Sequence, residues 1–275
     1  MGNESRAAVE PIEFHRIVVS AEPYPAPVQS WDGRAYQAAV QRVLDRLFAS
    51  CIGRIIIRHI ARQANAVEII PEPRYGPPVG GRGARVVPAR EPLGLRAGTT
   101  TFGGVATGQP GDAVIEFTPF FHADPRMQGT PQDQGPGSYV DEVLLEELFH
   151  ALRCLLGVLD RRQAPFDFDS VDEFHAAMVV NMYRSETGRR LSHAHVRGMV
   201  RDHLLSPWRG RTPQDRWEQE RMRDLCREMP HLTTVLRRVP RVICEHNPFV
   251  DYMREGPPYV LPVRAPRASS RRHAP

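Results

Sequence analysis

The chain has 275 residues, of which 41% are hydrophobic, enough for one large domain or two small ones with a proper core. Its formal net charge is +4, and all 36 basic side chains are arginines, because the sequence contains no lysine. No apolar run approaches the roughly 20 residues of a membrane-spanning helix, and nothing resembles a secretory signal, which predicts a protein without a membrane span that is made in the cytoplasm. The arginines are scattered rather than striped along a face with aromatics, which argues against nucleic-acid binding.

We expect one compact domain, a monomer, between two irregular ends. Residues 1–30 are rich in proline and predict an irregular segment, within which Glu13–Ser20 alternates enough for a short strand. The domain is predicted to span 31–256, and the basic tail 257–275 has nothing to bury and should be disordered. The four cysteines are far apart and form no C-x-x-C pair, which predicts reduced thiols.

The first quarter of the chain shows the spacing of helices and then of a strand. Asp32 is a suitable N-cap, and the apolar residues within 33–50 recur at helical spacing. Gly53 is expected to break this helix, after which 55–63 continues as a second helix or a buried segment. Val67–Ile70 predicts a strand.

The middle of the chain consists of two long connections around one strand. Residues 71–112 are rich in glycine, proline and arginine, which predicts a long loop with a short hairpin around Thr99–Gly103. Ala113–Phe120 is predicted to be the next strand, and a second connection of similar composition leads to residue 139. Long loops often carry functional sites, so we expect both to border a cleft.

The second half is predicted to be mainly helical. One helix should cover Asp141–Leu156 and end near Gly157. Another should begin at Ser170 or Asp172 and end near Gly188. Three further helices are predicted within 193–205, 215–229 and 231–239. The expected fold class is therefore α+β, with a mainly helical body and a small β-sheet.

The helix from Asp141 carries the sequence E-E-L-F-H. Glu146 and His150 are one turn apart and point the same way, so they can present an oxygen and a nitrogen to one ion. Glu147 has the place of the general base in an H-E-x-x-H helix. Glu173 is the candidate third ligand, because two antiparallel helices would bring it to the same ion. Two carboxylates and one imidazole make manganese more acceptable, relative to zinc, than the usual histidine-rich set.

The residue types alone leave other interpretations open. Glutamate pairs are common on exposed helix faces, and a first-turn glutamate such as Glu173 is stabilised by the helix N-terminus without any ligand. Glu147 and His150 also form the E-x-x-H pattern of diiron carboxylate proteins. That site would need further inward-facing carboxylates, for which Glu173 and Glu142 are the candidates.

Four separated blocks of the chain resemble the zinc metallopeptidase effector proteins of Gram-negative bacteria, the H-E-x-x-H family found as type III effectors and as toxin modules of type VI and Rhs systems. The blocks are GDAVIEFTPF (111–120), GPGSYVDEVLLEELFHALR (135–153), VDEFHAAMVVNMYRSETGRRLSHAH (171–195) and, less closely, LCREMPHLTTVLRRVPRVICEHNPFVDY (225–252). The resemblance implies a zincin-like fold and a zinc-dependent peptidase. It also implies export by a specialised secretion system and a protein substrate or partner in a target cell.

The resemblance assigns roles to the candidate site residues. It implies that His150 is a zinc ligand, that Glu147 activates water and that Glu173 is the third ligand. Glu146 stands where the family has its first histidine.

Further polar residues match the family pattern in the third block. Asn181, Tyr183 and His195 are implied to support the ligands or to stabilise the oxyanion formed during hydrolysis. Helix capping and hydrogen bonds between helices are the alternative roles for the same residues.

Two functions therefore remain open at the level of sequence. The first is a metallopeptidase with a carboxylate in place of one histidine. The second is a catalytically inactive pseudopeptidase that binds a partner protein through the same groove, as loss of a ligand histidine predicts. The lack of lysine fits a protein that avoids ubiquitination inside a eukaryotic cell, although a GC-rich genome gives the same composition.

Overall fold

The computed structural model describes residues 12–21, 33–71, 84–88, 101–102, 105–106, 110–117, 119, 139–164, 168, 170–189, 191 and 213–255. Within these ranges the fold is mixed, with seven helices and a small sheet, and most regular residues are helical. No helix in the described part of the chain is long and apolar enough to cross a membrane. The helix expected within 193–205 and the tail 257–275 lie outside the described residues.

Five strands form the main sheet in the order β1-β2-β3-β7-β4. They are β1 (Ile12–Phe14), β2 (Ile17–Val19), β3 (Val67–Pro71), β4 (Ala84–Pro88) and β7 (Ala113–Phe117). The three central strands β2, β3 and β7 run parallel, whereas the edge strands β1 and β4 are antiparallel to their neighbours. Every residue of β7 is buried, as expected for a central strand covered on both faces.

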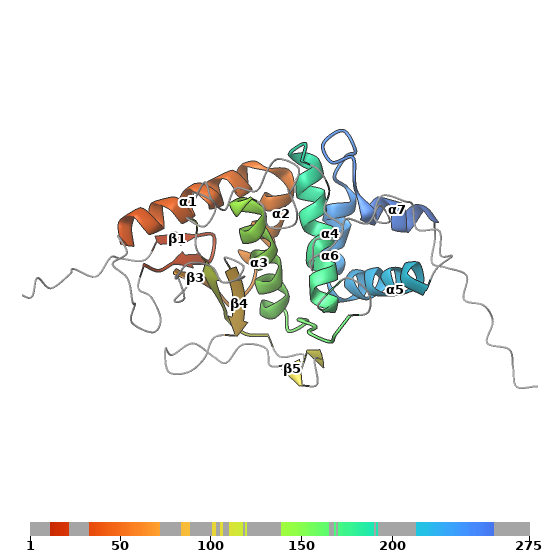
Figure 1. The fold of residues 1–275 in the computed structure, drawn as a ribbon, viewed down its shortest axis with the longest axis horizontal. Coiled ribbons are helices and arrows are strands. Elements are labelled where there is room, and N and C mark those ends of the chain that lie inside the picture. The colour runs from red at the N-terminus through yellow and green to blue at the C-terminus, as the bar shows by residue number, and fades with distance from the viewer. Residues whose placement is uncertain are drawn as a thin grey trace, which may run out of the picture.

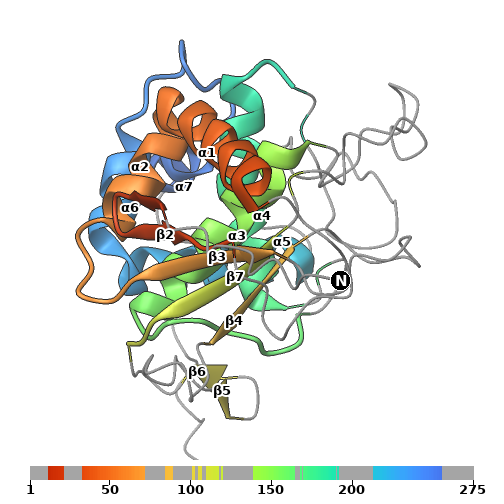
Figure 2. The same cartoon turned by 90° about the vertical axis from the view of Figure 1, so that its left-hand side faces the viewer.

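The helices fall into two groups around this sheet. In chain order they are α1 (Gly33–Ala49), α2 (Cys51–Ile60), α3 (Val140–Leu155), α4 (Val171–Glu186), α5 (Pro213–Glu228), α6 (Pro230–Arg237) and α7 (Pro248–Glu255). Figure 1 shows α3 between the sheet and α4, with α5, α6 and α7 beyond α4. Figure 2 shows α1 and α2 together on one side of the sheet. Helix α3 contacts both α4 and the edge strand β4, so its residues can face the helical body or the sheet.

The predicted strands at Val67–Ile70 and Ala113–Phe120 are confirmed as β3 and β7, which pair directly. The hairpin expected around Thr99–Gly103 is also confirmed, as β5 (Thr101–Phe102) and β6 (Val105–Ala106). The prediction that the rest of 71–112 is a loop was wrong in one respect, because Ala84–Pro88 forms strand β4. The short helix α7 was not predicted.

The N-terminal strand prediction needs correction. Glu13–Ser20 was expected to be one strand, but the chain turns within it and forms the β1–β2 hairpin. His15 and Arg16 both have positive φ, the left-handed conformation that a tight two-residue hairpin turn requires. Because β2 pairs with β3, the residues of this hairpin belong to the main sheet rather than to a separate irregular segment.

The break between α1 and α2 also differs from the prediction. It falls at Ser50, whose side-chain oxygen accepts a hydrogen bond from the Gly53 amide at 3.0 Å and so caps α2. Gly53 therefore lies inside α2 rather than between the helices. A Cβ at this position would meet the Leu47 carbonyl oxygen at 2.3 Å, so the tight turn needs a residue without a side chain.

Replacing Gly53 by alanine is expected to lower the free energy of unfolding by about 1–3 kcal/mol, the usual cost of overpacking a close contact. Gly188→Ala is the matched control, since that glycine has a positive φ but nothing within 4 Å of its Cβ position. Its cost should be near 1 kcal/mol, from backbone strain alone. Urea denaturation compares the two, and an equal loss would show that the contact with Leu47 can relax.

Both helices of the central pair end as the sequence predicted. In α3, Gly157 has a φ of 72°, and the Val158 amide bonds the Arg153 carbonyl at 2.9 Å. In α4, Gly188 has a φ of 67° and the Arg189 amide bonds the Arg184 carbonyl at 2.8 Å. These are Schellman motifs, in which glycine lets the chain reverse while the last carbonyls remain bonded. They turn the chain back at the ends of α3 and α4, where the polar groups described below are found.

Candidate metal centre

Three of the predicted ligands lie together where α3 meets the first turn of α4. Glu146, His150 and Glu173 each offer one ligand atom, and these atoms lie within 4.8 Å of one another. Glu146 and His150 are each only 8% exposed, and the side chain of Glu173 is 23% exposed. The group could therefore hold a metal ion in a largely shielded position. Carboxylate oxygens and a histidine nitrogen suit zinc and, with two carboxylates, manganese.

Local sequence explains how the third ligand reaches this position. Ser170 is the N-cap of α4, and its hydroxyl accepts from the Glu173 amide at 3.3 Å. The Asp172 amide in turn bonds the Asp160 carbonyl at 3.0 Å, which fixes the start of α4 to the connection from α3. Glu173 then faces His150 with 3.7 Å between its Oε2 and the Nε2 of the imidazole.

The other nitrogen of His150 is held by a neighbouring carboxylate. Its Nδ1 makes a very short contact with Oδ2 of Asp172, which leaves Nε2 directed toward the Glu173 side of the cluster. Burial disfavours the charged imidazole, but hydrogen bonds to Asp172 and Glu173 and their charges outweigh it and raise the pKa of His150 well above its ordinary value. The cluster therefore has a strong attraction for positive charge at this nitrogen.

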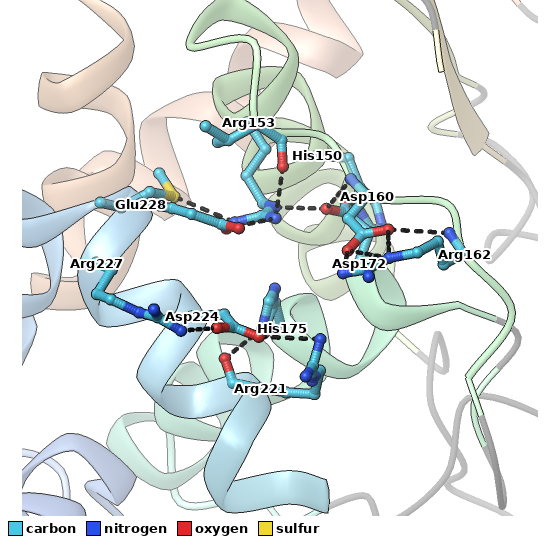
Figure 3. Close-up of polar contacts among 12 residues, drawn as sticks. His150, Arg153, Asp160, Arg162, Asp172, His175, Arg221, Asp224, Arg227 and Glu228 are labelled. Atoms are coloured by element: carbon cyan, nitrogen blue, oxygen red, sulfur yellow. Dashed lines mark hydrogen bonds and ion pairs between the residues drawn. The ribbon is translucent and has the colours of Figure 1, made fainter. Parts of the chain in front are cut away.

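Asp172 is held in turn by a buried arginine. Its second oxygen, Oδ1, accepts from Nε of Arg153, which is completely buried on α3 (Figure 3). Burial alone would raise the pKa of Asp172, but the charge of Arg153 and the hydrogen bond to His150 hold it far below its ordinary value. Asp172 is therefore a carboxylate in the folded protein, able to accept from both neighbours.

The predicted base lies beside the ligands. Glu147 is the next residue to Glu146 on α3 and is partly exposed, unlike its buried neighbours. Adjacent residues on a helix point about 100° apart, so the two glutamates have different surroundings.

The structure does not bring Tyr183 to the ligand cluster. It lies ten residues beyond Glu173 on α4, about 15 Å along the helix axis. Its hydroxyl donates to Asp141 at 2.7 Å, at the start of α3. Asn181 is buried in the same half of α4. His195 lies outside the described residues.

Tyr183 belongs to a second polar cluster around the N-terminus of α3. Arg189 donates to Asp141 at 2.8 Å and to Glu142 at 3.0 Å, and its guanidinium lies 4.0 Å from the centre of the Tyr139 ring. Burial would raise the pKa of Asp141, but hydrogen bonds from Arg189 and Tyr183 outweigh it and lower the pKa. This cluster joins the N-terminus of α3 to the C-terminal end of α4, at the end of the helix pair that lies away from the ligands. Glu142, proposed above as a possible extra metal ligand, is part of it.

Glu186 and Ser185, in the third of the blocks that resemble the family, accept hydrogen bonds from distant parts of the chain. The carboxylate of Glu186 accepts from the Cys51 amide and, at 2.9 Å, from the Ile52 amide, which caps the N-terminus of α2. The Ser185 hydroxyl accepts from the His246 amide at 2.9 Å. These contacts join the end of α4 to distant parts of the chain. None of the four cysteines, all of which lie in the described part of the chain, forms a disulfide, in agreement with the predicted thiols.

Sequence reasoning missed the two residues behind His150. Asp172 was considered only as a helix cap, and Arg153 was not considered. The D-E pair at 172–173 and the arginine one turn after His150 were the available signals, since a ligand histidine usually donates its other N–H to a carboxylate.

The sequence matches no family model and no curated protein. The assignment of a function therefore depends on the site itself.

Proposed function

We propose that the protein is a metal-dependent peptidase with a zincin-like fold, in which Glu146, His150 and Glu173 hold zinc or manganese. The observation that supports this most is the convergence of the three ligand atoms within 4.8 Å, from two helices on which the sequence had placed these three residues as candidate ligands. A divalent ion at such a site polarises a carbonyl group and increases the acidity of water.

The protein's own residues would then perform the proton transfers. Glu147 accepts a proton from the water that attacks the peptide carbonyl, and the same carboxyl group passes it to the departing amine as the C–N bond breaks. Asp172 keeps Nδ1 of His150 occupied, so that Nε2 is the nitrogen available to the ligand cluster. We further propose that the protein is a bacterial effector or toxin, exported by a specialised secretion system to act on a protein in a target cell.

The pseudopeptidase remains the second candidate, and one observation favours it. Three carboxylates surround His150, from Glu146, Asp172 and Glu173, and the raised pKa of the imidazole favours its charged form, which balances part of their charge. Such a cluster can persist as a buried ion-pair network without any metal. In that case the same surface would bind a partner protein without cutting it.

The proposed function is tested by the metal content of protein purified without a metal-affinity tag, measured by elemental mass spectrometry together with peptidase assays. We expect about one zinc or manganese ion per chain, as in other mononuclear sites. Glu147→Gln should keep the metal and lose hydrolysis by about 100-fold or more, the usual contribution of a general base. A metal-free wild-type protein would favour the pseudopeptidase. Unchanged hydrolysis in Glu147→Gln would remove Glu147 from the mechanism.

A further inference from the structure

A chain of polar contacts, buried except at its outer end, connects the ligand His150 with helix α5. His150 contacts one oxygen of Asp172, and Arg153 binds the other through Nε. Nη2 of Arg153 then pairs with Oε2 of Glu228, the last residue of α5, at 3.0 Å. Figure 3 shows these four side chains in sequence between α3, α4 and α5. We call His150, Asp172, Arg153 and Glu228 the buried relay.

Solvent screens most of the buried relay only weakly. The side chain of Arg153 is fully buried and that of Asp172 is 3% exposed, whereas Glu228 at the outer end is 31% exposed. Charges in such surroundings interact more strongly than on the surface, and an unpaired one is costly. The side chains of Arg153 and Asp172 therefore have little freedom to exchange their partners for water.

Further contacts fix Arg153 from several sides. Its Nη2 donates to the Val158 carbonyl at 2.6 Å, and its Nη1 lies 3.6 Å from the sulfur of Met229. Val158 follows the glycine that ends α3, and Met229 directly follows α5. The position of the guanidinium thus depends on both the end of α3 and the end of α5.

We propose that Asp172, Arg153 and Glu228 are positioning residues for His150, and that the docking of α5 therefore sets the metal affinity of the ligand cluster. The inference rests on the proposed metal centre and goes beyond it, because α5 supplies none of the three ligands. When Glu228 holds Arg153, the guanidinium fixes Asp172, and Asp172 fixes the ring of His150 with Nε2 toward Glu173. Loss of the contact between Glu228 and Arg153 removes one of the groups that hold the guanidinium, and Asp172 and the ring of His150 are then held less firmly.

The coupling must act in both directions. If docking of α5 increases the affinity for a metal, then metal binding stabilises the docked position of α5 by the same factor. Addition of zinc should therefore slow amide hydrogen exchange in α5, which contributes no ligand, as well as in α3 and α4.

The direct test is zinc affinity of the full chain, measured by competition with a chromophoric chelator. Asp172→Asn should weaken binding by about 10- to 100-fold, the usual effect of losing a ligand's hydrogen-bond partner. Glu228→Gln, at the outer end, should weaken it by a smaller factor of about 5 to 10, at the low end of the range of coupling between sites. Asp224→Asn is the matched control, because Asp224 lies one turn earlier on α5 and forms its ion pairs with Arg221 and Arg227 rather than with Arg153. The zinc affinity of Asp224→Asn should match that of the wild type.

Nuclear magnetic resonance of the metal-free protein gives an independent readout. The proton between His150 and Asp172 should appear as a strongly downfield signal in the wild type, shift in Glu228→Gln and disappear in Asp172→Asn. A purely structural role for Glu228 would change the melting temperature and leave this signal and the zinc affinity unchanged. Glu228→Gln keeps the size of the side chain at a partly exposed position, so it remains informative if Asp172→Asn does not fold.

The outcomes separate the two proposals. A wild-type protein that binds no zinc or manganese overturns the proposed function and the metal coupling together. A wild type that binds zinc, with Glu228→Gln binding it equally well, overturns the coupling alone and leaves the metal centre in place.

Discussion

Replacement of His150 by alanine is expected to weaken zinc binding by on the order of 100-fold or more. Structural zinc sites with four protein ligands bind with about 10–16 kcal/mol, so one ligand is worth roughly 3 kcal/mol, and each 1.4 kcal/mol corresponds to a factor of ten. His150 is the only nitrogen ligand in the cluster, which makes it the ligand that zinc prefers. Chelator competition on the purified protein measures the effect.

The control for this variant is His59→Ala. His59 is also largely buried, but its Nδ1 bonds the Ile55 carbonyl within α2, away from the cluster. His59→Ala should leave the zinc affinity unchanged.

Glu146→His should act in the opposite direction to His150→Ala and strengthen zinc binding, because a second imidazole replaces a carboxylate. If Glu146→His binds zinc while the wild type binds none, the wild-type site has lost its metal, and the pseudopeptidase is the better description of the protein.

Asp141→Asn is expected to lower the free energy of unfolding by about 3 kcal/mol, the low end of the cost of breaking a buried ion pair. Asp141 is completely buried and accepts from both Arg189 and Tyr183. An amide can replace only part of these contacts and leaves the guanidinium less well paired. Urea denaturation at neutral pH measures the loss. Asp45→Asn on the exposed face of α1 is the control and should stay within about 0.5 kcal/mol of the wild type.

The pH dependence of this effect has a definite sign. The folded-state pKa of Asp141 is lowered from its ordinary value, so the unfolded chain takes up the proton more readily. The stabilisation is therefore complete at pH values above the unfolded pKa, near 3.9, and is lost as the pH falls through the lowered pKa. The difference between wild type and Asp141→Asn should be constant around neutrality and shrink in acid. A difference that persists unchanged to low pH would point to lost packing instead.

The sequence predicted best those features that depend on neighbours along the chain. The helices α3 and α4 follow from apolar spacing, and their ends follow from Ser170, Gly157 and Gly188. The β1–β2 turn was missed because His15 and Arg16 are not the usual residues for positive φ. Strand β4 was missed because it lies among glycine and proline and is specified by pairing with β7 rather than by its own pattern.

The same distinction applies to the candidate site. Glu146 and His150 were selected because a helix places residues one turn apart on the same face. The roles of Asp172 and Arg153 depend on how α4 and α5 pack against α3, which no spacing along the chain reveals. Tyr183 was selected from a motif position, yet its hydroxyl serves the far end of the helix pair.

The position of Glu228 in the sequence has a consequence for the order in which the protein folds. The three ligands and Asp172 all belong to α3 and α4, which follow one another in the chain. The loop that brings Asp172 to Arg153 is therefore shorter than the loop that brings Glu228 to Arg153, and closing it costs less chain entropy. Glu228 arrives only with α5, after a much longer stretch of chain. We therefore expect the ligand cluster to assemble early, with Arg153 still without its carboxylate from α5. A nascent chain that ends before α5 would then contain the ligands without the contact between Arg153 and Glu228. We therefore expect tight metal binding only once α5 has been made and has docked.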